Sequence, residues 1–226
     1  MKKLFSTIAV VALTALSLNA QIKEGYVLYD MKIEGLPPEQ AAMMGDMETK
    51  VTFKNGKALT EVSSMMFSQQ MVVDETGMTM LMEQMGNKIA MKQTKEEMEK
   101  AEAKQKDKPA DPKIEYTNET KTIAGYECKK AIITTVGKDK KEEKTEMWYS
   151  EKFDNPNKDG KGRGQGIMKG LKGMPFEYSG GQGGMKFKMT AKEVSTDPVS
   201  DAKFVLSTEG YKVMTADEIK AMSGGK

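Results

Sequence analysis

The chain of 226 residues contains no histidine, one cysteine and one arginine. Without histidine it can form neither a Ser-His-Asp triad nor a Cys-His pair, and no imidazole can bind a metal ion. A single cysteine, Cys128, excludes intrachain disulfides and cysteine-based zinc sites. Because Arg163 is the only arginine, bidentate guanidinium recognition of phosphates is almost absent. We therefore expect a protein that is not an enzyme, with no cofactor and no metal site.

The chain has no apolar run long enough to span a bilayer, and even the run within the first twenty residues is shorter than the roughly 20 residues that a span needs. Lys2 and Lys3 precede an apolar run over 4–18, and a small residue, Ala20, ends the segment. This pattern predicts a signal peptide over residues 1–20 that is cleaved on export. Gln21 follows in place of a cysteine, so we do not expect a lipid-anchored protein. We expect export to the periplasm or cell envelope of a Gram-negative bacterium, or secretion.

Neither basic nor acidic side chains are in clear excess. The whole chain carries 35 basic and 33 acidic side chains, and loss of the two signal lysines makes them equal. A nucleic-acid partner normally requires a basic excess, so we do not expect one. The remaining residues 21–226 have the length of one domain, with mobile loops near 103–113 and 154–166.

Short alternating segments dominate the exported part. Residues 27–34 alternate apolar and polar side chains, as do 51–54, 114–117 and 185–192. Turn residues such as Asn55-Gly56 separate these segments from return strands. The pattern predicts a mainly β (α+β) fold with a curved antiparallel sheet or unclosed β-barrel.

Few segments predict helices. Residues 36–44 fit a short helix with proline in its first turn. Thr94 to Glu97 forms a capping box that opens a helix over about 94–106, and Thr215 to Glu218 forms a second one. The glycines of 164–170 lack the dinucleotide-binding spacing, and residues 155–166 lack the glutamate that ends a calcium loop, so both segments predict turns.

The chain contains 21 methionines, far more than an ordinary soluble protein. The thioethers could bind Cu(I), they could line a deformable cavity for apolar ligands, or they could simply fill the core. On alternating strands they point to one face. The residues we expect to line an apolar hollow are Met78, Met80, Met82, Met91, Trp148, Met185, Phe187 and Met189. Cys128 lies in a strand and we expect it to be buried as a small apolar residue.

The segment KTIAGYECKKA over 121–131 is followed by Met147-Trp148-Tyr149-Ser150, by Gly170 to Glu177 and by Glu209-Gly210-Tyr211-Lys212. This order resembles a family of exported Bacteroidetes proteins, the domain of unknown function numbered 4412. That family is distantly similar to the periplasmic lipoprotein carriers of the Lol type. The resemblance covers about residues 22–214. It implies a strongly curved, unclosed antiparallel barrel with helices over its concave face, and it implies no catalytic residues.

Together these observations predict a non-enzymatic exported protein that holds an apolar ligand, a lipid or a lipoprotein acyl chain, in a hollow lined by methionine. Two alternatives stay open. One is a methionine-rich protein that handles Cu(I), and the other is a structural or interaction module of the cell envelope. The sequence leaves the oligomeric state open.

Overall fold

The structure is a computed structural model. It describes residues 21–35, 47–65, 67–104, 110–137, 141–160, 165–182 and 185–222. The predicted signal peptide over 1–20 and the predicted helix over 36–44 lie outside the described residues. In the described part, no helix is long and apolar enough to cross a membrane.

The described residues form a 12-stranded sheet with two α-helices and two short 3-10 helices. The strands are β1 (Glu24–Glu34), β2 (Met47–Lys54), β3 (Lys57–Ser63), β4 (Phe67–Val73), β5 (Gly77–Gln84), β6 (Asn87–Thr94), β7 (Lys113–Ile123), β8 (Tyr126–Val136), β9 (Glu142–Ser150), β10 (Met174–Gln182), β11 (Met185–Ser195) and β12 (Lys212–Val213). The helices are α2 (Lys95–Lys104), α3 (Ala216–Met222), η1 (Gln165–Met168) and η2 (Asp201–Phe204). The predicted curved antiparallel sheet with few helices is confirmed.

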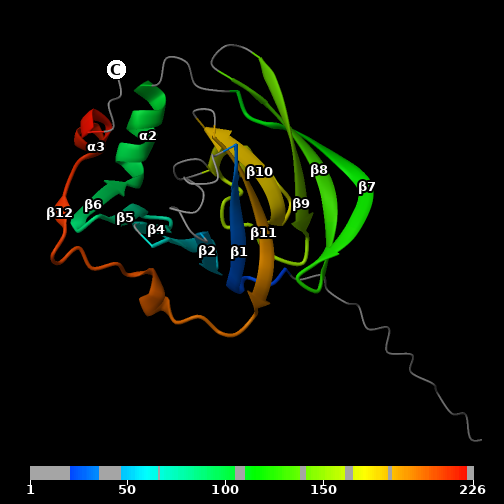
Figure 1. Cartoon of the computed structure of the whole chain (residues 1–226), viewed down its shortest axis with the longest axis horizontal. Helices are drawn as coiled ribbons and strands as arrows, with labels where there is room; N and C mark the ends of the chain where they lie inside the picture. The colour runs from blue at the N-terminus through cyan, green and yellow to red at the C-terminus, as the bar shows by residue number, and fades with distance from the viewer. Residues whose placement is uncertain are drawn as a thin grey trace, which may run out of the picture.

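The sheet consists of two antiparallel meanders, β1–β6 and β7–β11, which are joined by the pairing of β1 with β11. The order across the sheet is β12-β6-β5-β4-β3-β2-β1-β11-β10-β9-β8-β7, so β1 and β11 join the early strands to the late ones (Figure 1). Every neighbouring pair is antiparallel except β12 with β6. The ends of the sheet, β12 and β7, do not pair with each other, and the barrel is therefore open.

One aromatic side chain shows how strongly the sheet curves. The ring of Phe153, just after β9, lies 6.3 Å from the ring of Phe53 on β2 and 4.8 Å from that of Tyr126 on β8. These two strands are five steps apart in the sheet, which would separate them by about 24 Å if the sheet were flat. Ile22 pairs with Phe153 in an isolated bridge at the same place. The strands therefore curl around a shared core at this end.

The register assigns each side chain to one of two faces, because residues directly opposite each other in neighbouring strands share a face. The inner face carries most of the core. Its largest cluster contains Tyr29, Phe53, Phe176 and Met189 from β1, β2, β10 and β11. A second cluster, of β4–β6, packs against Met98 of α2 and against α3. The two helices thus cover the inner face of the early strands.

The outer face is crossed by residues 196–211, which we call the C-terminal strap. It leaves β11, runs beneath β1–β5 and reaches β12 on the far edge of the sheet (Figure 1). Phe204 of the strap is buried against Leu59 and Val72, whose side chains point away from the inner core. The strap is therefore a structural element with its own small core.

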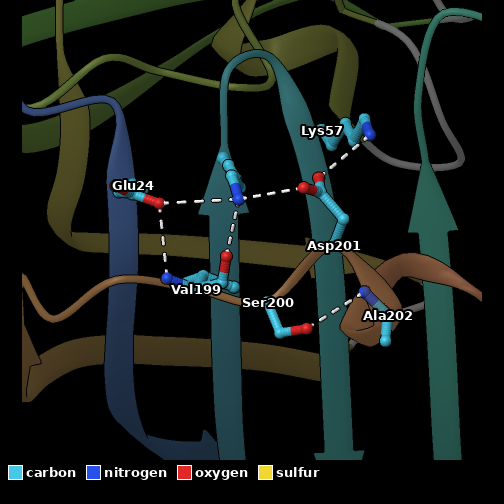
Figure 2. Close-up of polar contacts among 7 residues, drawn as sticks. Glu24, Lys57, Val199, Ser200, Asp201 and Ala202 are labelled. Atoms are coloured by element: carbon cyan, nitrogen blue, oxygen red, sulfur yellow. Dashed lines mark hydrogen bonds and ion pairs between the residues drawn. The ribbon is translucent and has the colours of Figure 1, made fainter.

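Polar contacts fix the start of the strap to the end of β2. Lys54 donates hydrogen bonds to the Val199 carbonyl at 2.7 Å and to Asp201 at 3.1 Å. Lys57 donates to the other oxygen of Asp201 at 3.3 Å, and the Val199 amide donates to Glu24 at 3.3 Å (Figure 2). Figure 2 also shows the Ser200 hydroxyl accepting from the Ala202 amide, which caps η2.

Local signals in the sequence correspond to local structure. Asn55-Gly56 forms the predicted hairpin turn, with both residues at positive φ. Both capping boxes are confirmed, because Thr94 and Thr215 each exchange hydrogen bonds with the glutamate three residues later. The turn between β5 and β6 is Met85-Gly86. Strand β10 falls in a glycine-rich segment for which the sequence predicted no strand.

The turn at Met85 predicts a stabilising substitution. Met85 is 78% exposed and has φ of 48°, a conformation that costs a non-glycine residue about 1 kcal/mol or more. Asparagine tolerates this conformation and favours a turn of this type before glycine. We expect Met85→Asn to raise the unfolding temperature by about 2–4 °C, measured by circular dichroism. Met85→Ala is the control, and an equal rise with alanine would contradict the backbone explanation.

The strap contact predicts a shifted carboxyl titration. Hydrogen bonds from Lys54 and then Lys57 hold the pKa of the Asp201 carboxyl below its ordinary value. The stabilisation from this contact is present above the pKa of aspartate in the unfolded chain, and it is lost as the pH falls through the lower folded-state pKa. We expect Lys54→Met to raise the Asp201 pKa, measured by carboxyl NMR titration. Lys203→Met, on the same strap, should leave it unchanged, and an equal shift would contradict the assignment.

Candidate functional site

Apolar side chains that are only half-buried gather at one end of the inner face. The register places Met31 opposite both Met47 and Met189, and Ile33 opposite Phe187. We call the half-buried members the inner-face patch, which consists of Met31, Ile33, Met47, Val62, Met82 and Phe187. They come from β1, β2, β3, β5 and β11, so the β1–β11 joint lies within the patch.

A buried hydroxyl lies beside this patch. Thr49 is 3% exposed and stands directly opposite Tyr29 on β1 and Val62 on β3. Its Oγ1 has no hydrogen-bond partner in the part of the chain that the structure describes. The neighbouring Tyr29 hydroxyl, in contrast, donates to the Pro175 carbonyl at 2.7 Å. Because buried polar groups are normally paired, Thr49 indicates a partner such as a water molecule or a ligand atom.

Methionines fill the inner face next to the patch. Met78, Met80 and Met91 are 4–6% exposed and form a cluster with Met71 and Val73. Met98 of α2 and Ala216 and Ile219 of α3 pack on this cluster. Three of the predicted lining residues are therefore brought together, and they lie in a packed layer beneath the helices.

The other predicted lining residues are divided among different surroundings. Phe187 lies over Gly180, where a Cβ would be 2.6 Å from its ring, so the glycine makes room for the phenyl group. Met189 accepts a hydrogen bond from the Tyr178 hydroxyl at 2.9 Å and is 4% exposed. Met82 is half-buried on β5. Met185 is the first residue of β11 and pairs with Gln182.

Trp148 does not share a face with Met147 and Tyr149, its buried neighbours on β9. The Lys121 ammonium lies 4.2 Å from the centre of the Trp148 ring, and that of Lys130 lies at 5.9 Å. Lys121 also donates to Glu177 at 2.8 Å. The structure therefore places Trp148 in a cation–π arrangement. Trp148 packs, as Phe187 does, against the cluster that contains Met189, and not on the cluster of Met78, Met80 and Met91.

A polar groove of about 450 Å³ opens on the outer face. Glu48, Glu61 and Glu83 line it, and each has a partner: Lys192, Gln70 and Tyr211, respectively. Hydrogen bonds from Tyr211 and Lys88 hold the pKa of Glu83 below its ordinary value. A second groove of about 500 Å³ lies at the β4–β5 turn beside the start of α2.

Cys128 is buried, as predicted, with no exposed surface. Burial raises the pKa of its thiol to about 12, so the thiolate needed for nucleophilic attack is not formed near neutral pH. Among the described residues, no group of three or more histidine, cysteine, aspartate or glutamate side chains could hold a metal ion.

Residues 154–160, which belong to the segment expected to be a mobile loop, form a hydrogen-bonded turn. Asn155 is 1% exposed; its side-chain oxygen accepts from the Asn157 amide at 2.9 Å and its side-chain nitrogen donates to the Met168 carbonyl at 3.4 Å. These bonds fix residues 154–160 against Leu171, which belongs to the core of the late strands. Asn155 is therefore structural.

Of the six patch residues, the sequence predicted Met82 and Phe187 as lining residues. It did not predict the other four, Met31, Ile33, Met47 and Val62, nor the neighbouring Thr49. A signal for Thr49 was present in the sequence, because it is the polar member of the alternating series Thr49, Val51 and Phe53. That series becomes informative only when the register places Thr49 on the inner face.

No family model and no curated protein matches this chain. Among solved structures, the chain is similar to PNGF-II with a TM-score of 0.48 and 15% identity, over 88% of this chain and 33% of that one. It is also similar to LprF from Mycobacterium bovis, with a TM-score of 0.32 and 12% identity, over 79% of this chain and 89% of that one. The chain thus spans a third of the length of PNGF-II. TM-scores below 0.5 do not establish a shared fold, and the resemblance to the domain of unknown function 4412 stays a prediction.

Removal of the unpaired hydroxyl gives a test of the site. Valine has nearly the shape of threonine but needs no hydrogen bond, so Thr49→Val should stabilise the ligand-free protein by about 1 kcal/mol in urea unfolding. The control is Thr60→Val, on the neighbouring strand β3 and the same face, where the side chain is half-buried and can reach water. A loss of stability in Thr49→Val would show that the hydroxyl already has a partner.

Proposed function

We propose that this chain is an exported, non-enzymatic protein that binds an amphiphile on the inner-face patch. The observation that carries the proposal is the unpaired Thr49 hydroxyl among half-buried apolar side chains. The hydrocarbon chain of the ligand lies on the patch, and a polar atom of the ligand accepts a hydrogen bond from Thr49. A fatty acid or the acyl chain of a lipoprotein has both parts.

The chemistry of the patch supports an apolar guest. Three of its six members, Met31, Met47 and Met82, have unbranched thioether side chains, which adapt to differently shaped ligands. The strands beneath them are hydrogen-bonded on both sides, so the floor of the site is preorganised. Binding sites for small molecules typically combine such an apolar lining with a few placed polar groups.

Charge around the site also fits. The ion pairs of β1, β2 and β11 lie on the outer face, where Lys192 bridges Asp30 and Glu48. Because neighbouring residues of a strand point to opposite faces, these charges are kept away from Met31, Met47 and Thr49. The apolar chain of a ligand on the patch therefore need not displace an ion pair.

The test is titration of the exported chain, residues 21–226, with cis-parinaric acid, a fatty acid that fluoresces in apolar surroundings. We expect a saturable increase in fluorescence at one molecule per protein, reversed by oleate. Val62→Lys places a charge in the patch and should weaken binding at least tenfold. Val205→Lys is the matched control, because Val205 is 78% exposed on the C-terminal strap.

Two results would contradict the proposal. One is that the wild-type protein gives no saturable signal and no ligand-dependent rise in unfolding temperature. The other is that Val62→Lys and Val205→Lys bind equally well. The first result would favour a structural or interaction module of the cell envelope, with a core that has no room for a guest.

A further inference from the structure

Three methionines stand in a row across three neighbouring strands. Met71 on β4 is directly opposite Met80 on β5, and Met80 is directly opposite Met91 on β6. Side chains in such positions start about 5 Å apart at Cβ, and methionine has three rotatable bonds. The three sulfur atoms can therefore converge on one point above β5. All three residues are 4–5% exposed, so water does not compete for this point.

A fourth thioether comes from the helix above the row. Helix α2 follows β6 without a loop, and the Thr94–Glu97 capping box fixes its first turn. Met98, in that turn, packs on the cluster of Met71, Met80 and Met91. Figure 1 shows α2 beside β4–β6. The sheet thus supplies three sulfur atoms and the helix a fourth, from the opposite side.

Methionine is concentrated here beyond the needs of packing. The buried part of this cluster is four methionines and Val73. In the largest cluster, only Met174 and Met189 among 11 buried residues are methionine. Isoleucine, valine and leucine fill other parts of the same sheet, and they pack a core with better-defined rotamers. A general need for apolar volume therefore does not explain why the methionines gather in one row.

We propose that Met71, Met80 and Met91, with Met98 from α2, form a binding site for Cu(I). Thioethers are soft, neutral donors that favour Cu(I) over the harder divalent ions. The described residues offer no cluster of carboxylates or other classical ligands that would attract those ions. The ion enters as Cu(I) and leaves as Cu(I), so the site requires no electron transfer.

The donor set has a consequence that distinguishes it from most copper sites. Protonated histidine and cysteine side chains must lose a proton before they bind a metal ion. The metal affinity of such sites therefore decreases as the pH is lowered. A thioether carries no proton to lose. Binding at this row should therefore be equally strong at pH 5.5 and at pH 7.5.

The test is an anaerobic titration of residues 21–226 with Cu(I) in competition with bicinchoninate, together with NMR of the methionine methyl groups. We expect one ion per protein and shifted methyl signals for Met71, Met80, Met91 and Met98. Met80→Leu should weaken binding at least tenfold. Met147→Leu is the matched control, because Met147 is fully buried in a different cluster and leucine preserves its volume.

Met91→Leu provides a second variant if Met80→Leu does not fold, and it should also lose at least tenfold. The proposal is overturned if the wild-type protein fails to compete with bicinchoninate. It is also overturned if the shifted methyl groups are those of Met65 and Met85, which are 88% and 78% exposed, or if affinity falls between pH 7.5 and pH 5.5. Binding of cis-parinaric acid is measured separately, so the two proposals can fail independently.

Discussion

The pairing of β1 with β11 is the contact on which the rest of the structure depends. Residues 24–34 and 185–195 are far apart in sequence, and their hydrogen bonds make one sheet out of two meanders. A slip by one residue would exchange the two faces of β11, which would place lysines inside and Met189 outside. The register shifts between Leu28 and Tyr29, where Lys192 is the extra residue of β11. This irregularity leaves Ala191 on the inner face while Lys192 reaches Asp30 and Glu48 on the outer one.

Most strands were predictable because their signals are local. Alternation in residues 27–34 and 185–192, the Asn55-Gly56 turn and the two capping boxes each act within a few residues. Strand β10 was not predictable in this way. Its Gly180 and Gly181 weaken any strand signal, yet Gly180 is needed because the Phe187 ring of the next strand occupies the space of its side chain. That reason lies in a different strand and cannot be read from β10 itself.

In the candidate site, too, local features were predictable from the sequence and features that depend on neighbouring strands were not. The alternation of Met78, Met80 and Met82 predicts correctly that they share a face, but it does not say what lies on that face. Helices α2 and α3 bury the first two, while Met82 stays half-buried because it lies nearer the opposite end of β5. Thr49 gains its significance only from its place between Tyr29 and Val62, which the sheet register creates. A polar residue on an otherwise apolar strand face can therefore be assigned to a site only after the neighbouring strands are known.

The short strand β12 has a consequence for the order in which the molecule is completed. Its two residues lie beside Ile89 and Ala90 of β6, and the Met214 amide donates to the Ala90 carbonyl at 2.8 Å. Until Lys212 and Val213 dock on β6, these backbone groups form an open edge next to a row of methionines. Open strand edges are templates for pairing with other chains. A folding chain is therefore exposed to self-association in the interval between the folding of the first meander and the docking of β12.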